Sequence, residues 1–179
     1  MLNNDNALLL VIDMQEKLVN MLKTDECAKN TTKLVQACTK LDIETIITEQ
    51  YPKGLGNTVE IIKNEVKENA KTLEKTAFSA WKENEIQKTI INSNKKQIII
   101  LGIEAHICVY QTAIDLVEAG YEVYFIKDCS ASRNKKEFKS GIELMKQFGV
   151  KISCLEIVLF ELLKSSKNPY FKEIQDLIK

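Results

Sequence analysis

Short apolar runs that end at polar residues constrain this chain more than any other feature of its sequence. Residues 7–13 read ALLLVID and residues 97–102 read QIIILG, so both runs are apolar on each face of an extended chain. Such runs are typical of strands buried on both faces of a parallel sheet. The strand pattern recurs at residues 44–49, 72–75, 122–126 and 151–155.

Segments with helical periodicity alternate with these strands. They span residues 25–41, 59–66, 83–92, 106–119, 135–148, 159–163 and 169–178. In the last helix we expect Asn168 as the N-cap and Pro169 at the first helical position. The alternation predicts an α/β fold, in which helices cover both faces of a parallel sheet. Because 179 residues contain no repeat or linker, we expect a single domain over residues 1–179.

Composition narrows the classes of function. The 25 basic and 25 acidic residues give a formal net charge of zero, which argues against a nucleic-acid surface. The apolar runs are too short to span a membrane, and the N-terminus lacks the basic region of a secretory signal. Five scattered cysteines without a C-x-x-C motif are typical of reduced thiols. We therefore expect a cytoplasmic protein that binds neither nucleic acid nor membrane.

The stretch GIEAHICVYQTA, residues 102–113, places a cysteine where a strand gives way to a helix. Ligands of open parallel sheets bind beyond the carboxyl ends of the strands. Unpaired N–H groups at a helix N-terminus would favour the thiolate of Cys108; the alternative is a buried structural cysteine. His106 is an improbable partner for Cys108, because residues two apart on a helix do not face each other. We therefore interpret His106 as a loop or cap residue.

The other cysteines give the comparison for Cys108. Cys27, Cys38 and Cys154 lie in apolar stretches and are expected to be inert core residues. Cys129 follows a strand end and is the main rival to Cys108 as the reactive thiol.

Two charged residues at strand ends are candidate partners of Cys108. Asp13 ends a buried strand, where a lone carboxylate would be costly without a partner. Lys75 ends the 72–75 strand, and its charge would keep Asp13 ionised and lower the pKa of the thiol. Alternatively, Asp13 is a cap or loop residue and Lys75 is a solvated surface lysine. Position alone leaves both interpretations open.

Four stretches together resemble the isochorismatase-like cysteine hydrolases: LLLVIDMQEKLV, TEQYPKGLG, EKTAFSAW and LGIEAHICVYQTAIDLVEAGYEVYFIKDCSAS. The resemblance runs through nearly the whole chain, and the C-terminal FELLKSSKNPYFKEIQDLIK is similar to the small isochorismatase-domain proteins. It implies a three-layer α/β/α fold around a six-stranded parallel sheet of order 3-2-1-4-5-6. It also implies assembly as a homo-oligomer.

The same resemblance implies a catalytic site. Asp13, Lys75 and Cys108 match the family's triad. A cis peptide between Ile103 and Glu104 is expected to turn the backbone N–H groups of Glu104 and Cys108 into an oxyanion hole. We assign Gln50, Phe78 and Trp81 to the walls of the substrate pocket, with a core position as the alternative for Trp81.

Departures from the family pattern narrow the reaction. Members that hydrolyse nicotinamide hold a metal through an Asp-x-His and a further histidine after the second strand. Here that region reads TEQYP, residues 48–52, and the only histidine is His106. We therefore expect no metal and no cofactor, and nicotinamidase becomes a less favoured alternative.

True isochorismatase cleaves a vinyl ether without a nucleophilic cysteine. The presence of Cys108 instead points to a small amide, ureide or ester-like substrate and an acyl-enzyme intermediate. The alternative from another class is a non-catalytic oligomeric binding protein on the same fold. A nucleotide-binding domain is disfavoured because no G-x-G-x-x-G follows a predicted strand.

Overall fold

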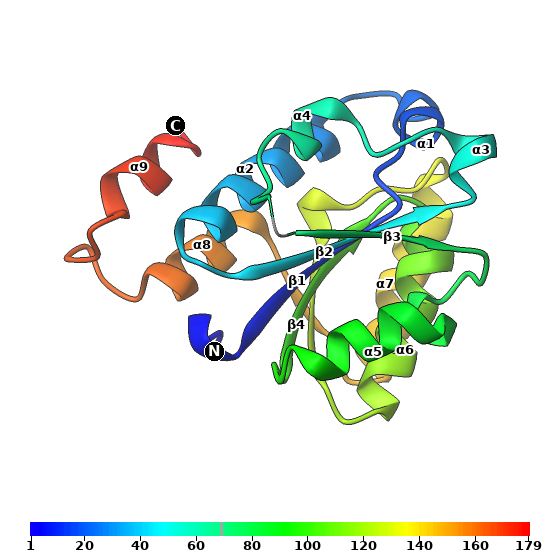
Figure 1. The fold of residues 1–179 in the computed structure, drawn as a ribbon. Helices are drawn as coiled ribbons and strands as arrows, with labels where there is room; N and C mark the ends of the chain where they lie inside the picture. The colour runs from blue at the N-terminus through cyan, green and yellow to red at the C-terminus, as the bar shows by residue number, and fades with distance from the viewer. Residues whose placement is uncertain (69) are drawn as a thin grey trace.

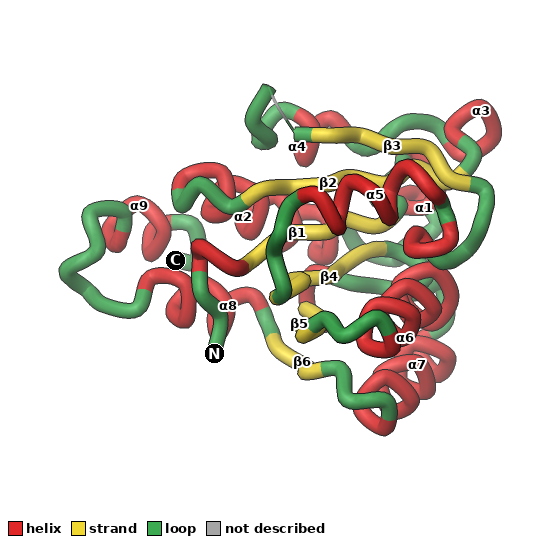
Figure 2. Tube along the Cα trace, turned by 60° about the horizontal axis from the view of Figure 1, so that its bottom comes forward, coloured by secondary structure: helices red, strands yellow, loops and turns green. Residues whose placement is uncertain are grey.

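The computed structural model describes residues 1–68 and 70–179. It contains a six-stranded, all-parallel sheet of order β3-β2-β1-β4-β5-β6, and Figure 2 shows the strands in this order from top to bottom. The strands are β1 (Ala7–Ile12), β2 (Glu44–Gln50), β3 (Lys71–Lys75), β4 (Gln97–Gly102), β5 (Glu122–Ile126) and β6 (Lys151–Ser153). The predicted fold class and strand order are confirmed.

Helices cover both faces of the sheet (Figure 1). One face carries α2 (Glu26–Lys40), α4 (Glu60–Lys63), α8 (Leu155–Leu163) and α9 (Phe171–Asp176). The other face carries α5 (Asn84–Asn92), α6 (Tyr110–Glu118) and α7 (Lys135–Gln147). These layers explain why β1 is apolar throughout: Leu9 and Val11 pack in the first layer, whereas Leu10 and Ile12 pack in the second.

Short elements and several helix starts differ from the sequence-based expectation; α8, for example, begins at Leu155 and not at residue 159. The periodicity did not reveal α1 (Glu16–Asn20), α3 (Pro52–Leu55) or the 3-10 helices η1 (Asn4–Asn6), η2 (Ala80–Lys82) and η4 (Lys127–Cys129). The predicted cap of the last helix is wrong, because Tyr170 is the N-cap of α9. The Asn168 side chain instead accepts the Tyr170 N–H in the preceding turn, at 3.0 Å. Among the described helices, none is long and apolar enough to cross a bilayer.

Strand register brings three carboxyl ends together. Ile12, the last residue of β1, lies opposite Thr48 on β2 and Gly102 on β4. At the edge of the sheet Gln50 lies opposite Lys75. Gly102 has φ of +152°, and a Cβ there would lie 2.1 Å from the Ile12 carbonyl oxygen, so only glycine allows this close approach.

Candidate active site

Asp13 follows the last residue of β1 and is completely buried. Its φ of 53° places it in the left-handed region, which aspartate tolerates better than most residues. The Thr48 hydroxyl donates a hydrogen bond of 2.8 Å to Oδ1 of Asp13. The backbone turn and the hydroxyl together fix the orientation of the carboxylate.

Lys75, the last residue of β3, supplies the opposite charge. Its Nζ lies 2.8 Å from Oδ2 of Asp13, and neither side chain has any exposed surface. The ammonium also donates to Gln50 Oε1 at 2.7 Å and to the carbonyl oxygens of Phe78 at 3.0 Å and Ala77 at 3.2 Å. Together with Oδ2 of Asp13, the ammonium thus has four acceptors within reach of its three protons.

The charged acceptor among these four is Oδ2 of Asp13. This atom is buried and lies 2.8 Å from the Lys75 ammonium. The carboxylate of Asp13 also hydrogen-bonds the Cys108 thiol. Such a carboxylate can accept a proton from a neighbouring group.

Cys108 lies beside this ion pair in the π-helix Ala105–Val109, which leads into α6. Single π-helical turns often occur at functional sites. Burial and the Asp13 carboxylate raise the pKa of the thiol to about 12, outweighing the lowering effect of Lys75. Lys75 lowers the thiol pKa as expected, but the expected net lowering is wrong, because a thiol with only 7% exposure loses the solvation that a thiolate requires.

The resting proton therefore belongs on sulfur. Burial also raises the pKa of Asp13 above its ordinary value, against the lowering effects of Lys75 and Thr48. A more basic carboxylate next to a protonated thiol is the arrangement of a general base beside its nucleophile.

The expected cis peptide between Ile103 and Glu104 is absent: every peptide bond among residues 1–68 and 70–179 is trans. The chain turns instead at Glu104, which adopts the left-handed conformation with φ of 56° and ψ of 54°. The Glu104 N–H donates to no acceptor in the part of the chain that the structure describes. The turn therefore presents a free donor next to Cys108 without a cis bond.

The three residues assigned to the pocket walls lie in different surroundings. Gln50 binds Lys75 through Oε1 and the Thr76 carbonyl through Nε2. The exposed Phe78 ring lines an open groove of about 260 Å³ together with Tyr110 and Ile114. Trp81 is partly buried and packs edge-on against Tyr121 with ring centroids 5.5 Å apart. Its neighbour Ala80 donates its N–H to the Thr112 hydroxyl, which in turn donates to the Cys108 carbonyl.

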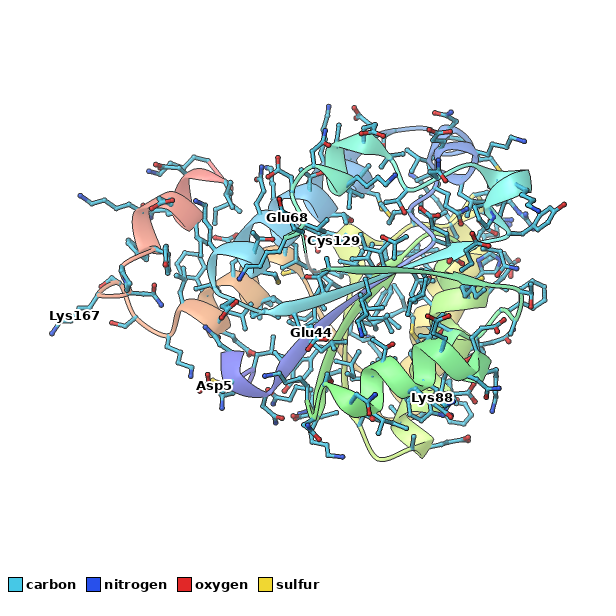
Figure 3. All side chains as sticks on the ribbon, viewed as in Figure 1. Asp5, Glu44, Glu68, Lys88, Cys129 and Lys167 are labelled. Atoms are coloured by element: carbon cyan, nitrogen blue, oxygen red, sulfur yellow. The ribbon has the colours of Figure 1, made fainter. Side chains whose placement is uncertain are left out.

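A larger hollow of about 420 Å³ lies elsewhere, at the amino ends of β2 and β3. Glu44, labelled in Figure 3, lines it and marks the start of β2. The triad sits at the carboxyl ends of the strands, so this hollow does not belong to the site.

Two other polar residues near the strand ends have structural partners. The carboxylate of Glu49 accepts both the N–H and the hydroxyl of Thr58, at 2.7 and 2.8 Å. His106 Nδ1 lies 2.9 Å from the Ser132 hydroxyl, and His106 does not pair with Cys108. The described residues contain no group of three or more His, Cys, Asp or Glu side chains arranged to hold a metal ion.

Sequence reasoning did not find Thr48 or Gln15. Gln15 is buried, and its side-chain amide donates to the carbonyls of Gln50 and Gly56 while its oxygen accepts the Gln50 N–H. Gln15 thereby links the end of β2, where Gln50 lies, to the loop at Gly56. The available signals were the glutamine in IDMQ and the register that places Thr48 opposite Ile12.

Comparisons with known proteins agree with this geometry. The family model for the isochorismatase domain matches residues 7–157. Isochorismatase domain-containing protein 2 of Danio rerio is 38% identical over 178 residues, which cover 99% of this chain and 89% of the relative.

Solved structures share the fold. The MAR1 ribonuclease of Caenorhabditis elegans superposes with a TM-score of 0.93 at 37% identity, covering 99% of this chain and 91% of that one. YcaC of Escherichia coli, described as an octameric hydrolase of unknown specificity, has a TM-score of 0.89 at 23% identity, covering 99% and 94%. On the family model and the curated relatives, the chain belongs to the isochorismatase family of hydrolases.

Proposed function

We propose that this protein is a metal-independent cysteine hydrolase that cleaves a small amide, ureide or ester-like substrate. The observation that carries the proposal is the buried Asp13–Lys75 ion pair beside Cys108, in which the Asp13 carboxylate also hydrogen-bonds the Cys108 thiol. A carboxylate that accepts a hydrogen bond from a thiol is placed to take its proton.

The reaction follows from this arrangement. Oδ2 of Asp13 takes the thiol proton as the sulfur of Cys108 attacks the substrate carbonyl, and the backbone N–H groups of Glu104 and Cys108 stabilise the oxyanion. Asp13 then gives the proton to the leaving amine or alcohol as the C–N or C–O bond breaks. In the second half Asp13 removes a proton from water, which attacks the thioester; as the C–S bond breaks, Asp13 returns the proton to the sulfur and the acid is released.

The residues around the triad support a small substrate. Cys108 is 7% exposed, so a polymer has little access to the sulfur in this conformation. Gln50 positions Lys75, and Phe78 forms part of the nearby groove. We assign both to the substrate pocket.

Assembly and location complete the proposal. Ile157 and Phe160 on α8 are 53% and 41% exposed, which supports a homo-oligomer that covers them. The YcaC hydrolase is described as octameric. Five free cysteines support a reducing, cytoplasmic location.

A ribonuclease is the second candidate, because the Caenorhabditis elegans relative at 37% identity carries that name. The experiment is a turnover screen of small amides, ureides and esters, with nicotinamide and a short RNA as further arms. Wild type, Cys108→Ala and the matched control Cys154→Ala are compared with and without a chelator.

We expect chelator-insensitive hydrolysis of a small substrate that disappears only in Cys108→Ala. RNA cleavage that survives Cys108→Ala would favour the ribonuclease. Chelator-sensitive hydrolysis of nicotinamide would favour a nicotinamidase, and thermal stabilisation by a ligand without turnover would favour a binding protein.

A further inference from the structure

Four consecutive residues after β5 hold the turn that carries Glu104. We call residues 130–133 the brace segment. It contains the end of the motif KDCSAS, and no residue of that motif takes part in the proposed reaction. The contacts are Gly102 N to Ser130 Oγ at 3.2 Å, Ala131 N to Gly102 O at 3.2 Å, Ala105 N to Ala131 O at 3.0 Å, His106 Nδ1 with Ser132 Oγ at 2.9 Å, and Arg133 N to Glu104 Oε1 at 3.0 Å. Every residue of the brace segment thus contacts the turn.

The Glu104 carboxylate lies at the centre of these contacts. Its side chain is only 8% exposed, and Oε2 lies 3.6 Å from Nη1 of Arg133 and 3.9 Å from Nε2 of His106. Oε2 is buried and accepts no hydrogen bond from a described residue. The guanidinium of Arg133 is therefore the nearest fixed charge that compensates this carboxylate.

Glu104, Arg133 and His106 lie on the far side of the turn from Lys75. In the sheet, β4 and β5 carry the turn and the brace segment, whereas Lys75 belongs to β3 at the other edge. His106 packs against α7, where a Cβ on Gly141 would lie 2.9 Å from the His106 Cα. The Glu104 carboxylate thus contacts the brace segment, which holds the turn, and does not contact Asp13 or Lys75.

We propose that the Glu104 carboxylate, paired with Arg133 of the brace segment, is a positioning residue that fixes the backbone donors of the oxyanion turn. The inference deepens the proposed hydrolase function and rests on it. A left-handed conformation is unfavourable for glutamate and persists only where its surroundings enforce it. The buried carboxylate supplies that enforcement, because its own side chain ties residue 104 to the brace segment.

The first test measures the turn directly. Amide hydrogen exchange by mass spectrometry is compared between wild type, Glu104→Ala and Glu104→Gln, with Glu122→Gln as a matched control. Glu122 is also an ion-paired carboxylate, bonded to Lys151 and Tyr124 at the amino end of β5. We expect Glu104→Ala to speed exchange in a peptide covering residues 102–110 and to leave a peptide containing Asp13 unchanged.

The isosteric variant separates hydrogen bonding from charge. Glu104→Gln keeps an oxygen that accepts the Arg133 N–H but loses the negative charge opposite the guanidinium. We therefore expect an increase in exchange smaller than that of Glu104→Ala. Melting temperatures identify any variant that has lost its fold.

The second test separates the oxyanion donors from the thiol. Acylation of Cys108 by p-nitrophenyl acetate develops an oxyanion, whereas alkylation by iodoacetamide does not. Misplacing a catalytic group by about 1 Å costs on the order of 10²-fold. We expect Glu104→Ala to slow acylation by about that factor while alkylation keeps its wild-type rate.

Two results would overturn the inference: unchanged exchange in residues 102–110 of Glu104→Ala, or an equal loss of acylation and alkylation. A wild-type protein that p-nitrophenyl acetate never acylates would instead contradict the hydrolase function. In that case the exchange measurement alone still decides whether Glu104 positions the turn.

Discussion

The Thr48 hydroxyl occupies Oδ1 of Asp13 through a hydrogen bond of 2.8 Å, so the two carboxylate oxygens have different roles. Oδ2 faces the Lys75 ammonium at 2.8 Å, and the carboxylate also hydrogen-bonds the Cys108 thiol. One oxygen thus fixes the carboxylate, while the other is available to a proton from Cys108.

Asp13→Asn should separate thiol acidity from turnover. The Asp13 charge raises the pKa of the Cys108 thiol, so its removal should lower that pKa and speed alkylation by iodoacetamide. Hydrolysis should nevertheless fall by on the order of 10²–10⁴-fold, because the proton carrier is gone. Rates of alkylation and turnover on the same folded preparations check this, and retained turnover per folded molecule would show that Asp13 only caps the strand end.

Lys75→Met should raise the thiol pKa further and destabilise the fold. Without Lys75, the buried Asp13 carboxylate has no positive partner, and breaking a buried ion pair in this way costs about 3–5 kcal/mol of unfolding free energy. Asp13→Asn should cost less, because Lys75 keeps its three other acceptors. Urea unfolding at pH 8 measures the difference, and equal losses in the two variants would contradict the role of Lys75.

The stability of Lys75→Met should also depend on pH in a predictable direction. Without Lys75 the pKa of Asp13 in the folded state should rise further above its ordinary value. The folded state then binds more protons than the unfolded state between those two values, so stability falls as pH rises through that range. The destabilisation of Lys75→Met should therefore be smaller at pH 4 than at pH 8, when each is compared with wild type at the same pH.

Thiol labelling should select two of the five cysteines. Burial raises the pKa of Cys27, Cys38 and Cys108 alike to about 12, and it raises that of Cys129 well above its ordinary value. Among these four thiols Cys108 alone is hydrogen-bonded to a carboxylate that can take its proton, so we expect it to react. Cys129, labelled in Figure 3, is fully buried in the layer beneath α2. Cys154 is partly exposed, so it replaces Cys129 as the rival of Cys108.

We expect iodoacetamide to label Cys108 and Cys154 in the folded protein and only Cys154 in Cys108→Ala. Peptide mass spectrometry assigns the sites. Early labelling of Cys27, Cys38 or Cys129 would contradict the packing of that layer.

The apolar surface of α8 should mediate self-association. Light scattering should give a mass that is a multiple of the 20.4 kDa chain, and Ile157→Glu should reduce it. Ile91→Glu on α5 is the matched control, because Ile91 is 50% exposed on another helix. A monomeric wild type at all working concentrations, or the same loss of mass in both variants, would count against this surface.

The sequence predicted the sheet because β1 and β4 are apolar on both faces, which only a doubly covered parallel strand requires. It also placed Asp13, Lys75 and Cys108 at strand ends on one edge. Their shared site followed from the resemblance, because strand order decides which ends are neighbours.

The remaining features depend on contacts between distant loops. The thiol pKa was predicted with the wrong sign because the depth of Cys108 below the surface is set by the packing around the π-helix. The partners of Lys75 include the carbonyls of Ala77 and Phe78, which no sequence pattern identifies. The packing of Trp81 against Tyr121 leaves no periodic signal, so the sequence could not decide between a pocket and a core position for Trp81.

The most direct measurement is the mass spectrum of the protein quenched in acid during its reaction with p-nitrophenyl acetate. If Cys108 is the nucleophile, wild type should gain the mass of one acetyl group, peptide mapping should place it on Cys108, and Cys108→Ala should lack it. An acetyl group found only on Cys154 or on lysines, at equal levels in wild type and Cys108→Ala, would contradict an acyl-enzyme on Cys108.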